Sequence, residues 1–464
     1  MLEWIATINS VVNGVVWGPP FMMLLAGTGL YLTIRLGFFQ FTHLRHAWRN
    51  SFGLMFRRDV EPEDGAITPF QAVTSAMAAT IGVGNIAGVA TAIVAGGPGA
   101  IFWMWMVALV GMATKMAEVT LGLKYRNVDA DGHVSGGVFY YIEKGLGSKW
   151  RWLAVLYAFF AGLAAFGIGN MVQSNTLAEA VAQASGGQIP TWVTGVVAVV
   201  LVGAVTLGGI SRIAVTAEKV VPVMAAAYLI GSLGVLIIHI TEIPAALGMI
   251  VQHAFQPMAA VGGFAGASVA MAIRYGVARG IFSNEAGLGS ASIVHAQARN
   301  TPFRQGFWGV WEVFIDTLVV CTMTALVILL TGVLGTTDEN GELINGALLT
   351  TTAFTIGLPG PGGYVVLTAI IFFAYTTMLT WNFYGEKSWE YLFGRGVVLP
   401  YRLLFLVFVY LGSVGALRLV WDIADTLNGL MAAPNLIALV LLAGVMAREK
   451  INYFNQLNGR KPKR

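Results

Sequence analysis

Glycine and asparagine residues interrupt a long apolar run of this sequence at residues 80–91, TIGVGNIAGVAT. The run extends from Ile67 to Val94 and is long enough to cross a bilayer as one helix. Gly82 and Gly84 each disfavour a helix by about 1 kcal/mol relative to alanine. Asn85 adds an amide group, which is rare at bilayer depth unless it lines a cavity. We therefore expect a broken helix whose free backbone N–H and C=O groups can bind a ligand.

Other interpretations of this stretch stay open from its residues alone. Gly84 and Gly88 have the spacing of a small-residue motif for helix packing. Gly82, Gly84 and Ala87 loosely match a dinucleotide-binding fingerprint, although no strand precedes them. The glycines can also simply fill gaps between helices. These residues alone do not decide between a broken helix and the other interpretations, so a second observation is needed.

A second interrupted apolar run supplies that observation at residues 280–289, GIFSNEAGLG. Three polar residues, Ser283, Asn284 and Glu285, lie there between glycines. Helix packing does not explain a charged, glycine-flanked cluster inside a span. The alternative is that the span is drawn wrongly and that the cluster lies in a loop. We favour a second broken helix.

The composition places these breaks in a membrane protein. The chain has 464 residues, of which 56% are hydrophobic and 11% charged, and its mean hydropathy is +0.72. Soluble domains carry about 25% charged residues. The single cysteine excludes an intramolecular disulfide, and a net charge of +4 does not indicate nucleic acid as a partner. We expect an all-α polytopic membrane protein that contacts the lipid bilayer.

The apolar runs predict about eleven transmembrane helices of roughly 20 residues or more. Their expected ranges are 12–36, 67–95, 97–121, 152–182, 190–208, 213–240, 262–298, 306–333, 363–386, 400–420 and 426–447. Placing the N-terminus outside and the C-terminus in the cytoplasm puts nearly all of the 27 Lys and Arg residues on the cytoplasmic side. Only Arg418 then lies outside. We expect a multi-pass protein of the plasma (inner) membrane in this orientation.

The spans divide into two similar sets of five. Residues 67–258 form the first and residues 259–447 the second, and each begins with an interrupted helix. Each also has a long connection between its second and third members, at 122–151 and 334–362. The first set begins in the cytoplasm and the second outside, as in an inverted repeat. Residues 1–66 then form an extra N-terminal helix and a cytoplasmic loop, and 448–464 a basic cytoplasmic tail.

Three blocks of the sequence resemble one known family. Residues 96–111, GGPGAIFWMWMVALVG, resemble the signature of the alanine/glycine:cation symporters, also called sodium:alanine symporters. The interrupted stretches at 80–93 and 280–291 are similar to that family as well. The resemblance implies the leucine-transporter fold, a five-plus-five inverted repeat. It also implies uptake of small neutral amino acids, mostly alanine and glycine, with sodium or sometimes protons.

The resemblance implies an amino-acid site at the two breaks. For the substrate carboxylate we expect the backbone around Gly82 to Gly84, with the second half-helix starting near Asn85. For the ammonium we expect carbonyls freed near Phe282, Ser283 and Asn284, with Phe282 as a gate. Further candidates for the substrate site, each with helix packing as the alternative, are Asn170, Gln173 and Trp381.

Sodium is expected as a co-transported ligand, with no cofactor. Thr376 and Thr377, with the carbonyl near Phe373, match the ion-binding pattern of the implied fold. Threonine hydroxyls also commonly bond back to their own helix. Asn85 and the carbonyl of Thr80 are candidates for a second ion next to the substrate.

Charged residues inside the spans are candidates for coupling or gating, with structural pairing as the alternative that we favour for most of them. Glu285, Glu312 and Asp316 are costly unless they are paired or hydrated. Arg279 can pair with Asp422 or Asp425 as an outer gate, or with Glu312 or Asp316. We also expect Lys115 and Glu118, one turn apart, to form a local ion pair.

These features predict a secondary transporter that imports alanine or glycine with sodium by alternating access. The alternative is a proton-coupled carrier of small amino acids or of another solute, since Glu285 and Asp316 can bind protons. A channel would need a continuous polar pore, whereas the polar residues gather at mid-depth. An enzyme is not expected, because the sequence has no HExxH, GxSxG or Walker motif.

Overall fold

The fold is almost entirely helical. The computed structural model describes residues 2–54, 65–259, 266–338, 341–415 and 418–459. Within those ranges the only sheet is a short hairpin of β1 (Asn127–Val128) and β2 (Val134–Ser135). Among the described residues, seven helices are long and apolar enough to cross a membrane, or eight with one bent pair counted as a span. The predicted all-α polytopic class is confirmed, whereas the count of about eleven spans is not.

The first broken helix lies where the sequence predicts it. α5 (Pro69–Thr80) begins at a capping box between Thr68 and Gln71. After α5 comes the 3-10 turn η2 (Val83–Asn85), and the chain resumes as α6 (Ala87–Gly96). The second half-helix therefore begins at Ala87, two residues later than expected. The cause is the 3-10 turn, which takes Asn85 out of the helix.

The second broken helix ends in a left-handed residue. α14 (Val269–Asn284) stops at Glu285, whose φ is 57°, and the chain resumes as α15 (Ala291–His295). Between them Gly287 and Gly289 have φ values of 101° and 78°, which residues with a side chain rarely adopt. The predicted break is therefore present. The first residues of the expected span, 262–265, lie outside the described residues.

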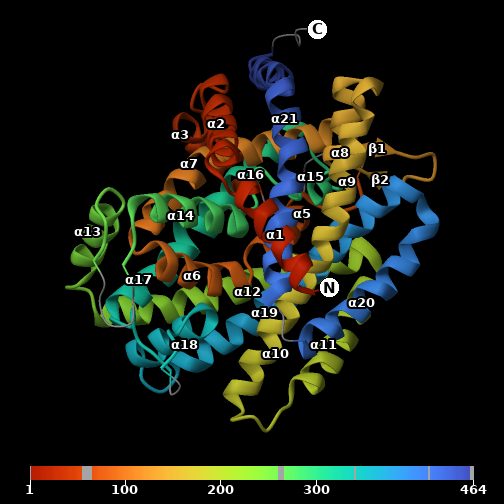
Figure 1. Cartoon of the computed structure of the whole chain (residues 1–464). Coiled ribbons are helices and arrows are strands. Elements are labelled where there is room, and N and C mark those ends of the chain that lie inside the picture. Colours follow the sequence, from red (N-terminus) through yellow and green to blue (C-terminus); the bar gives the residue numbers. More distant parts are fainter. Residues whose placement is uncertain (1, 55–64, 260–265, 339–340, 416–417, 460–464) are drawn as a thin grey trace.

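The N-terminal segment is a bent pair of helices, not the single span 12–36. α1 (Leu2–Val16) and α2 (Pro19–Arg35) meet at 43°. The two prolines that start α2 lack the N–H donors that would continue α1. Three short elements follow, α3 (Phe39–Thr42), α4 (Leu44–Asn50) and η1 (Phe52–Leu54). In Figure 1 α1 crosses α21, the last helix of the chain.

The remaining elements complete the two sets of helices. Those of the first set are α7 (Gly99–Lys124), α8 (Val138–Tyr141), η3 (Ile142–Leu146), η4 (Ser148–Trp150), α9 (Arg151–Phe166), η5 (Gly167–Met171), α10 (Val172–Ala184), α11 (Thr191–Thr206), α12 (Gly209–Ile238) and α13 (Ile243–His253). Those of the second set are α16 (Pro302–Val313), η6 (Phe314–Cys321), α17 (Thr322–Leu330), α18 (Gly346–Gly357), α19 (Gly362–Phe393), η7 (Arg395–Val397), α20 (Val398–Val414) and α21 (Arg418–Leu457).

Both long connections between second and third members carry structure of their own. The first holds the β hairpin and α8, and the second holds α18. In each set one long span contains a π-helical turn, η5 between α9 and α10 and η6 between α16 and α17. Turns of this kind often mark functional sites. In Figure 1 the carboxyl end of α21, α3 and the hairpin lie at one end of the molecule, and α18 lies toward the other.

Candidate functional site

The two helix breaks face each other in the core. A Cβ atom added to Gly84 would lie 3.1 Å from a ring carbon of Phe282 and 3.5 Å from Cα of Ser283. A Cβ atom on Gly82 would lie 2.7 Å from Oγ1 of Thr377 on α19. Glycine at both positions therefore lets the first break touch α14 and α19 together. These five residues are all buried and lie together.

The backbone of the first break is partly satisfied by side chains. The N–H of Gly82 donates to Oδ1 of Asn85 at 2.8 Å, and the N–H of Val83 donates to Oε1 of Gln173 at 3.4 Å. Gln173 in turn donates to the carbonyl of Ile168 in the π-helical turn η5. Gln173 thus lies at the break, as expected. A bound carboxylate would replace these internal acceptors.

Asp316 joins the two breaks through hydrogen bonds from neutral groups. Its carboxylate accepts from Asn85 at 2.6 Å, from Ser283 at 2.9 Å and from Thr317 at 2.8 Å. The carboxylate is fully buried, and no ion pair to it is found among the described residues. A carboxylate buried in this way keeps a net negative charge that only a cation or a proton can neutralise.

The only cysteine of the chain lies at the same place. Cys321, at the end of η6, is buried, and its sulfur lies 3.4 Å from Nδ2 of Asn85 and 3.3 Å from Oγ of Ser283. The side chain of Asn284 instead donates to Thr317 and accepts, at Oδ1, from the N–H of Ala286. The carboxyl end of α14 therefore packs directly on η6.

The two candidate threonines of α19 differ in their partners. Thr377 donates across to the carbonyl of Ala78 on α5 at 3.0 Å. Thr376 donates to the carbonyls of Phe372 and Phe373 on its own helix. Thr80 also bonds back within α5. Thr377 thus directly joins α19 to the end of α5, with the Phe373 carbonyl one turn away.

Two other predicted site residues point elsewhere or reach the site indirectly. Asn170 donates to the carbonyl of Phe405 on α20, which matches the helix-packing alternative. Trp381 donates to Oε1 of Glu285 at 2.9 Å and packs closely on Gly169 of η5. Trp381 therefore ties the second break to α19.

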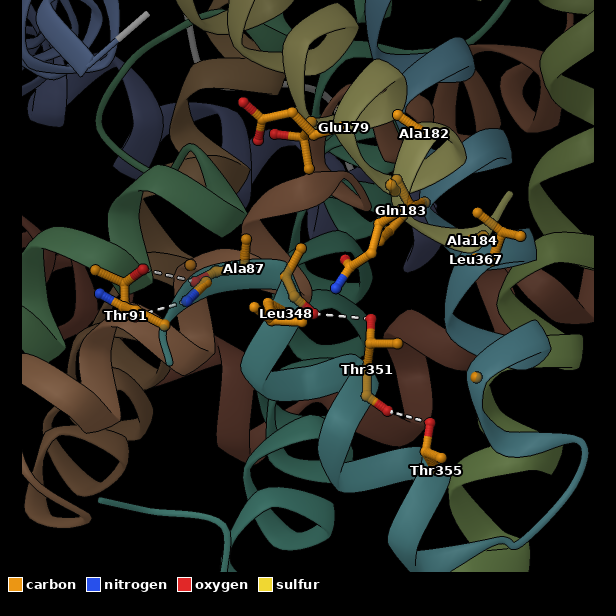
Figure 2. A pocket seen from close by; sticks show the side chains of 18 of the residues that line it. Ala87, Thr91, Glu179, Ala182, Gln183, Ala184, Leu348, Thr351, Thr355 and Leu367 are labelled. Carbon is orange, nitrogen blue, oxygen red and sulfur yellow. Dashed lines mark hydrogen bonds between the residues drawn. The ribbon is translucent and has the colours of Figure 1, made fainter. Parts of the chain in front are cut away.

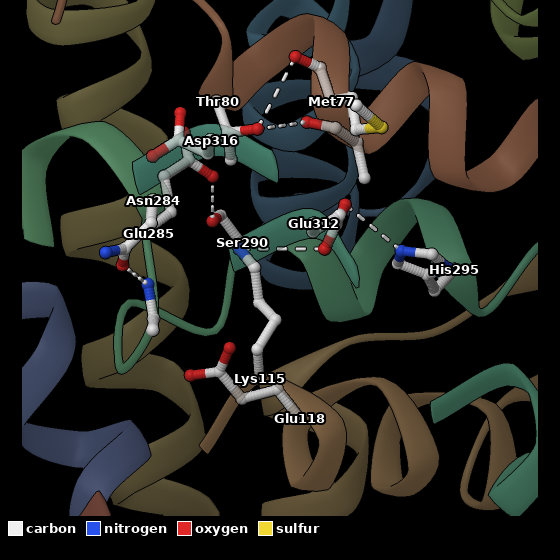
Figure 3. Close-up of polar contacts among 12 residues, drawn as sticks. Met77, Thr80, Lys115, Glu118, Asn284, Glu285, Ser290, His295, Glu312 and Asp316 are labelled. Atoms are coloured by element: carbon white, nitrogen blue, oxygen red, sulfur yellow. Dashed lines mark hydrogen bonds and ion pairs between the residues drawn. The ribbon is translucent and has the colours of Figure 1, made fainter. Parts of the chain in front are cut away.

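A separate cluster of buried charges lies behind the second break (Figure 3). Nζ of Lys115 lies 3.9 Å from Glu312, and His295 lies 3.3 Å from the other oxygen of that carboxylate. Glu118 instead accepts from the N–H groups of Gly287 and Gly289. The expected Lys115–Glu118 ion pair is therefore wrong. The physical reason is that the glycine turn supplies donors to Glu118 that are better placed than Lys115.

A large cavity leads from the surface toward the breaks (Figure 2). Its volume is about 1030 Å³, and it lies between α6, α10, α18 and α19. Polar residues on its walls include Thr91, Glu179, Gln183 and Thr351. We call it the vestibule. Arg279 and Trp421 also line it.

Paired side chains of α14 and α21 separate the vestibule from the breaks. Arg279 makes two hydrogen bonds to Asp425, at 3.1 and 2.8 Å, so one of the expected partners of Arg279 is confirmed. The ring of Phe282 stacks on Trp421 with centroids 6.1 Å apart, and the Arg279 guanidinium lies over the same ring. We call these four residues the vestibule gate.

Sequence reasoning missed the polar hub around Asp316. It assigned Ser283 to substrate binding and Asp316 to coupling, and it did not predict the hydrogen bond between them. Thr317, Trp421 and Cys321 were not singled out for a role at the site. Their only sequence signal is a polar or aromatic side chain inside an apolar run, which packing explains equally well.

Comparison with known proteins identifies the family. A family model described as "Sodium:alanine symporter family" matches residues 2–464. The chain belongs to the sodium:alanine symporter family. This membership and the fold make it a sodium-coupled amino-acid transporter and not an enzyme.

Relatives of this family member are similar over nearly their whole length. The sodium/alanine symporter AgcS of Methanococcus maripaludis is 46% identical over 98% of both chains. An uncharacterised transporter of Haemophilus influenzae is 48% identical over 98% of this chain and 97% of that one. The crystal structure of MhsT in complex with L-phenylalanine has a TM-score of 0.55 at 11% identity, over 84% of this chain and 99% of that one. MhsT has the leucine-transporter fold, and at this low sequence identity the likeness shows the fold alone.

Proposed function

We propose that this family member imports alanine, or another small neutral amino acid, together with sodium. The observation that carries the proposal is the buried Asp316 carboxylate between the two breaks, whose hydrogen-bond donors are all neutral. A cation there would neutralise a charge that is otherwise costly to bury. The printed name of AgcS, a sodium/alanine symporter, supports the choice of cation and substrate.

The residues divide into two proposed ion positions. In the first, oxygens of Asn85, Ser283 and Asp316 and the carbonyl of Thr80 hold one sodium beside the substrate. In the second, the hydroxyls of Thr376 and Thr377 and the carbonyl of Phe373 hold another. Neutral oxygens with at most one carboxylate suit a hard monovalent cation better than a transition metal. The strongest support for the second ion position comes from Thr377, because its hydroxyl already donates to a carbonyl near the end of α5.

The substrate is proposed to lie between the breaks. Its carboxylate would accept from the N–H groups of Gly82 to Gly84, and its ammonium would face carbonyls at the end of α14. Gln173 and Trp381 would bound the pocket from α10 and α19, and Phe282 would cover it on the vestibule side. Phe282 already approaches Gly84 closely, since a Cβ atom added there would lie 3.1 Å from its ring.

Alternating access follows from the two closures around this pocket. On one side stands the vestibule gate. On the other, the start of α5 is held by Ile67, which bridges Ala298, and by Gln71, which donates to Glu218 of α12 at 2.9 Å. We propose that the vestibule faces outside, since nearly all Lys and Arg residues then lie in the cytoplasm. The N-terminus is then outside and the C-terminus inside, in the plasma (inner) membrane.

The deciding experiment is uptake of radiolabelled alanine into proteoliposomes. An inward sodium gradient and an inward proton gradient would be compared for the wild type, Asp316→Asn and Thr377→Ala. Uptake driven by sodium and lost in both variants would support the proposal. Uptake driven only by protons would favour the alternative, a proton-coupled carrier, with Glu285 or Asp316 as the proton site. No amino-acid uptake under either gradient would refute both.

The proton-coupled alternative has one specific observation in its favour. Glu285 is buried, and among the described residues its carboxylate accepts from the neutral side chains of Ser290, at 2.5 Å, and Trp381. If Glu285 bound a proton, its carboxyl group would be neutral, and no metal cation would be needed to compensate a buried charge. A relative that is 38% identical, YrbD of Bacillus subtilis, is named a putative sodium/proton-dependent alanine carrier protein.

A further inference from the structure

A proline lies inside α21, beyond the part of the helix that carries two residues of the vestibule gate. Trp421 and Asp425 lie near the start of α21, and Pro434 lies further on. A proline has no N–H, so the carbonyl four residues before it loses its helical partner and the helix is easier to bend there. Directly after the proline, Asn435 donates to Glu118 at 2.7 Å and to the carbonyl of Gly287 at 2.8 Å. These bonds fix α21 to the core just after Pro434, while the first turns of α21 depend on other contacts.

Some of those other contacts come from η5, since a Cβ atom on Gly167 would lie 2.9 Å from Cβ of Ala424, and others come from the N-terminal pair of helices. The indole N–H of Trp17, at the bend between α1 and α2, donates to the backbone carbonyl of Asp425 at 3.1 Å. The amide of Asn13 donates to Oγ1 of Thr426 at 3.1 Å. A Cβ atom on Gly429 would lie 1.9 Å from a methyl group of Val16, so the two helices touch at this glycine. The bend between α1 and α2 is therefore hydrogen-bonded to α21 at Asp425, a residue of the vestibule gate.

Asp425 is thus held from two sides. Arg279 binds its carboxylate, and Trp17 binds its carbonyl. Elsewhere on α1, Trp4, Val11 and Val15 are 65–71% exposed. The bonds that Asn13 and Trp17 donate to α21 lie at the level of the gate. A helix that served only to anchor the chain in lipid would not need two hydrogen bonds there.

We propose that the N-terminal helix pair positions the vestibule gate, with Trp17 and Asn13 as positioning residues for Asp425. By holding the first turns of α21, they keep the Asp425 carboxylate in line for the bidentate bond to Arg279. Loss of this hold lets α21 swing about Pro434, so the gate opens more often. Neither residue touches substrate or ion. This positioning role follows from the geometry of the gate, and only its effect on substrate release depends on the proposed function.

The first test needs no substrate. Cys321 lies behind the gate, beside Asn85 and Ser283, and is 1% exposed, so its labelling reports how often the gate opens. A membrane-impermeant maleimide would be reacted with the protein with and without Trp17→Phe, which keeps an aromatic ring but removes the donor. We expect labelling to be about three- to tenfold faster, as for loss of one hydrogen bond. Cys321→Ser gives the background rate.

Trp4→Phe is the matched control, because Trp4 lies on α1 and is 70% exposed. It should leave the labelling rate unchanged. An unchanged rate in Trp17→Phe, or an equal rise in Trp4→Phe, would overturn the positioning role whatever the protein transports. A lower unfolding temperature of Trp17→Phe without faster labelling would show a purely structural contact and would also overturn it.

The second test uses a double-mutant cycle on bound alanine. Release of radiolabelled alanine from sodium-loaded protein would be timed for Trp17→Phe, Arg279→Lys and the double variant. If Trp17 acts through Asp425, each single change speeds release and the double variant adds little, because the bond is already broken. Additive effects would refute action through the gate. A wild type that binds no alanine would refute the proposed function instead, and the labelling test would still decide the positioning role.

Discussion

The side-chain amide of Asn85 donates a 2.6 Å hydrogen bond to the carboxylate of Asp316, a residue 231 positions further along the chain. This contact joins the first helix break to the π-helical turn η6. Ser283, from the second break, donates to the same carboxylate. Both breaks therefore depend on one buried charge, and a cation bound there would pull on all three elements.

Removing that charge should weaken sodium binding. In Asp316→Asn we expect the sodium concentration for half-maximal alanine uptake to rise at least about tenfold, because a neutral amide loses the charge attraction that favours a cation. The measurement is uptake against sodium concentration in proteoliposomes. Glu242→Gln, which changes an exposed carboxylate, is the control and should behave like the wild type. An unchanged sodium dependence in Asp316→Asn would place the ion elsewhere.

The two threonines of α19 should differ in their importance. Thr377→Ala should lose about tenfold or more of sodium-driven uptake, because it removes the hydroxyl that faces Ala78. Thr377→Ser should retain most of the activity, since the hydroxyl stays. Thr376→Ala should have the smaller effect, since Thr376 bonds to its own helix. Initial uptake rates of the three variants test this order. The reverse order would mean that α19 turns to present Thr376.

Gly82 should not tolerate a methyl group. Gly82→Ala would place Cβ 2.7 Å from Thr377, so the break must move away from α19. We expect sodium-driven uptake to fall about tenfold or more while the protein stays folded, because overpacking of this kind costs about 1–3 kcal/mol. Gly88→Ala is the matched control on the same broken segment, since no atom lies within 4 Å of its added Cβ. Equal effects of the two changes would exclude the clash as the cause.

Lys115 should stabilise the core through Glu312. Lys115→Met leaves a buried carboxylate without its cation and should lower the free energy of unfolding by about 3–5 kcal/mol. Glu312→Gln combined with Lys115→Met should restore part of that loss, because the Glu312 carboxylate that lost its cation is then replaced by a neutral amide. Thermal unfolding in detergent compares the variants. If the double variant is less stable than Lys115→Met alone, Glu312 is not the partner that matters.

Much of the fold was predictable from local patterns. Glycines at 82 and 84 and the polar cluster at 283–285 predicted both breaks, because a helix cannot easily pass such residues in hydrocarbon. The bend at Pro19 was missed, although two adjacent prolines carry that signal. The short helix α18 was also missed, since its apolar residues were taken for part of a connection.

The site was less predictable, because side chains far apart in the sequence decide it. Glu312 and Asp316 are four residues apart, a spacing that puts two helical residues on one face. Yet Glu312 contacts Lys115 and His295, whereas Asp316 accepts from Asn85 and Ser283. The π-helical turn that begins at Phe314 shifts the register between them. Spacing also favoured a Lys115–Glu118 pair, and the donors of the glycine turn after Glu285 overrode it. Neither the turn nor the donors leave a local sequence signal.

The contact of α1 with α21 has a consequence for biosynthesis. Trp17 and the carbonyl that it binds are 408 residues apart, so the first helix enters the bilayer long before its partner is translated. Until then Asn13 and Trp17 have no polar partner on α21, and the helix pair must wait in lipid with those groups exposed. Docking of α1 is therefore among the last steps of assembly. A chain that ends before α21 leaves its N-terminal helices without this attachment.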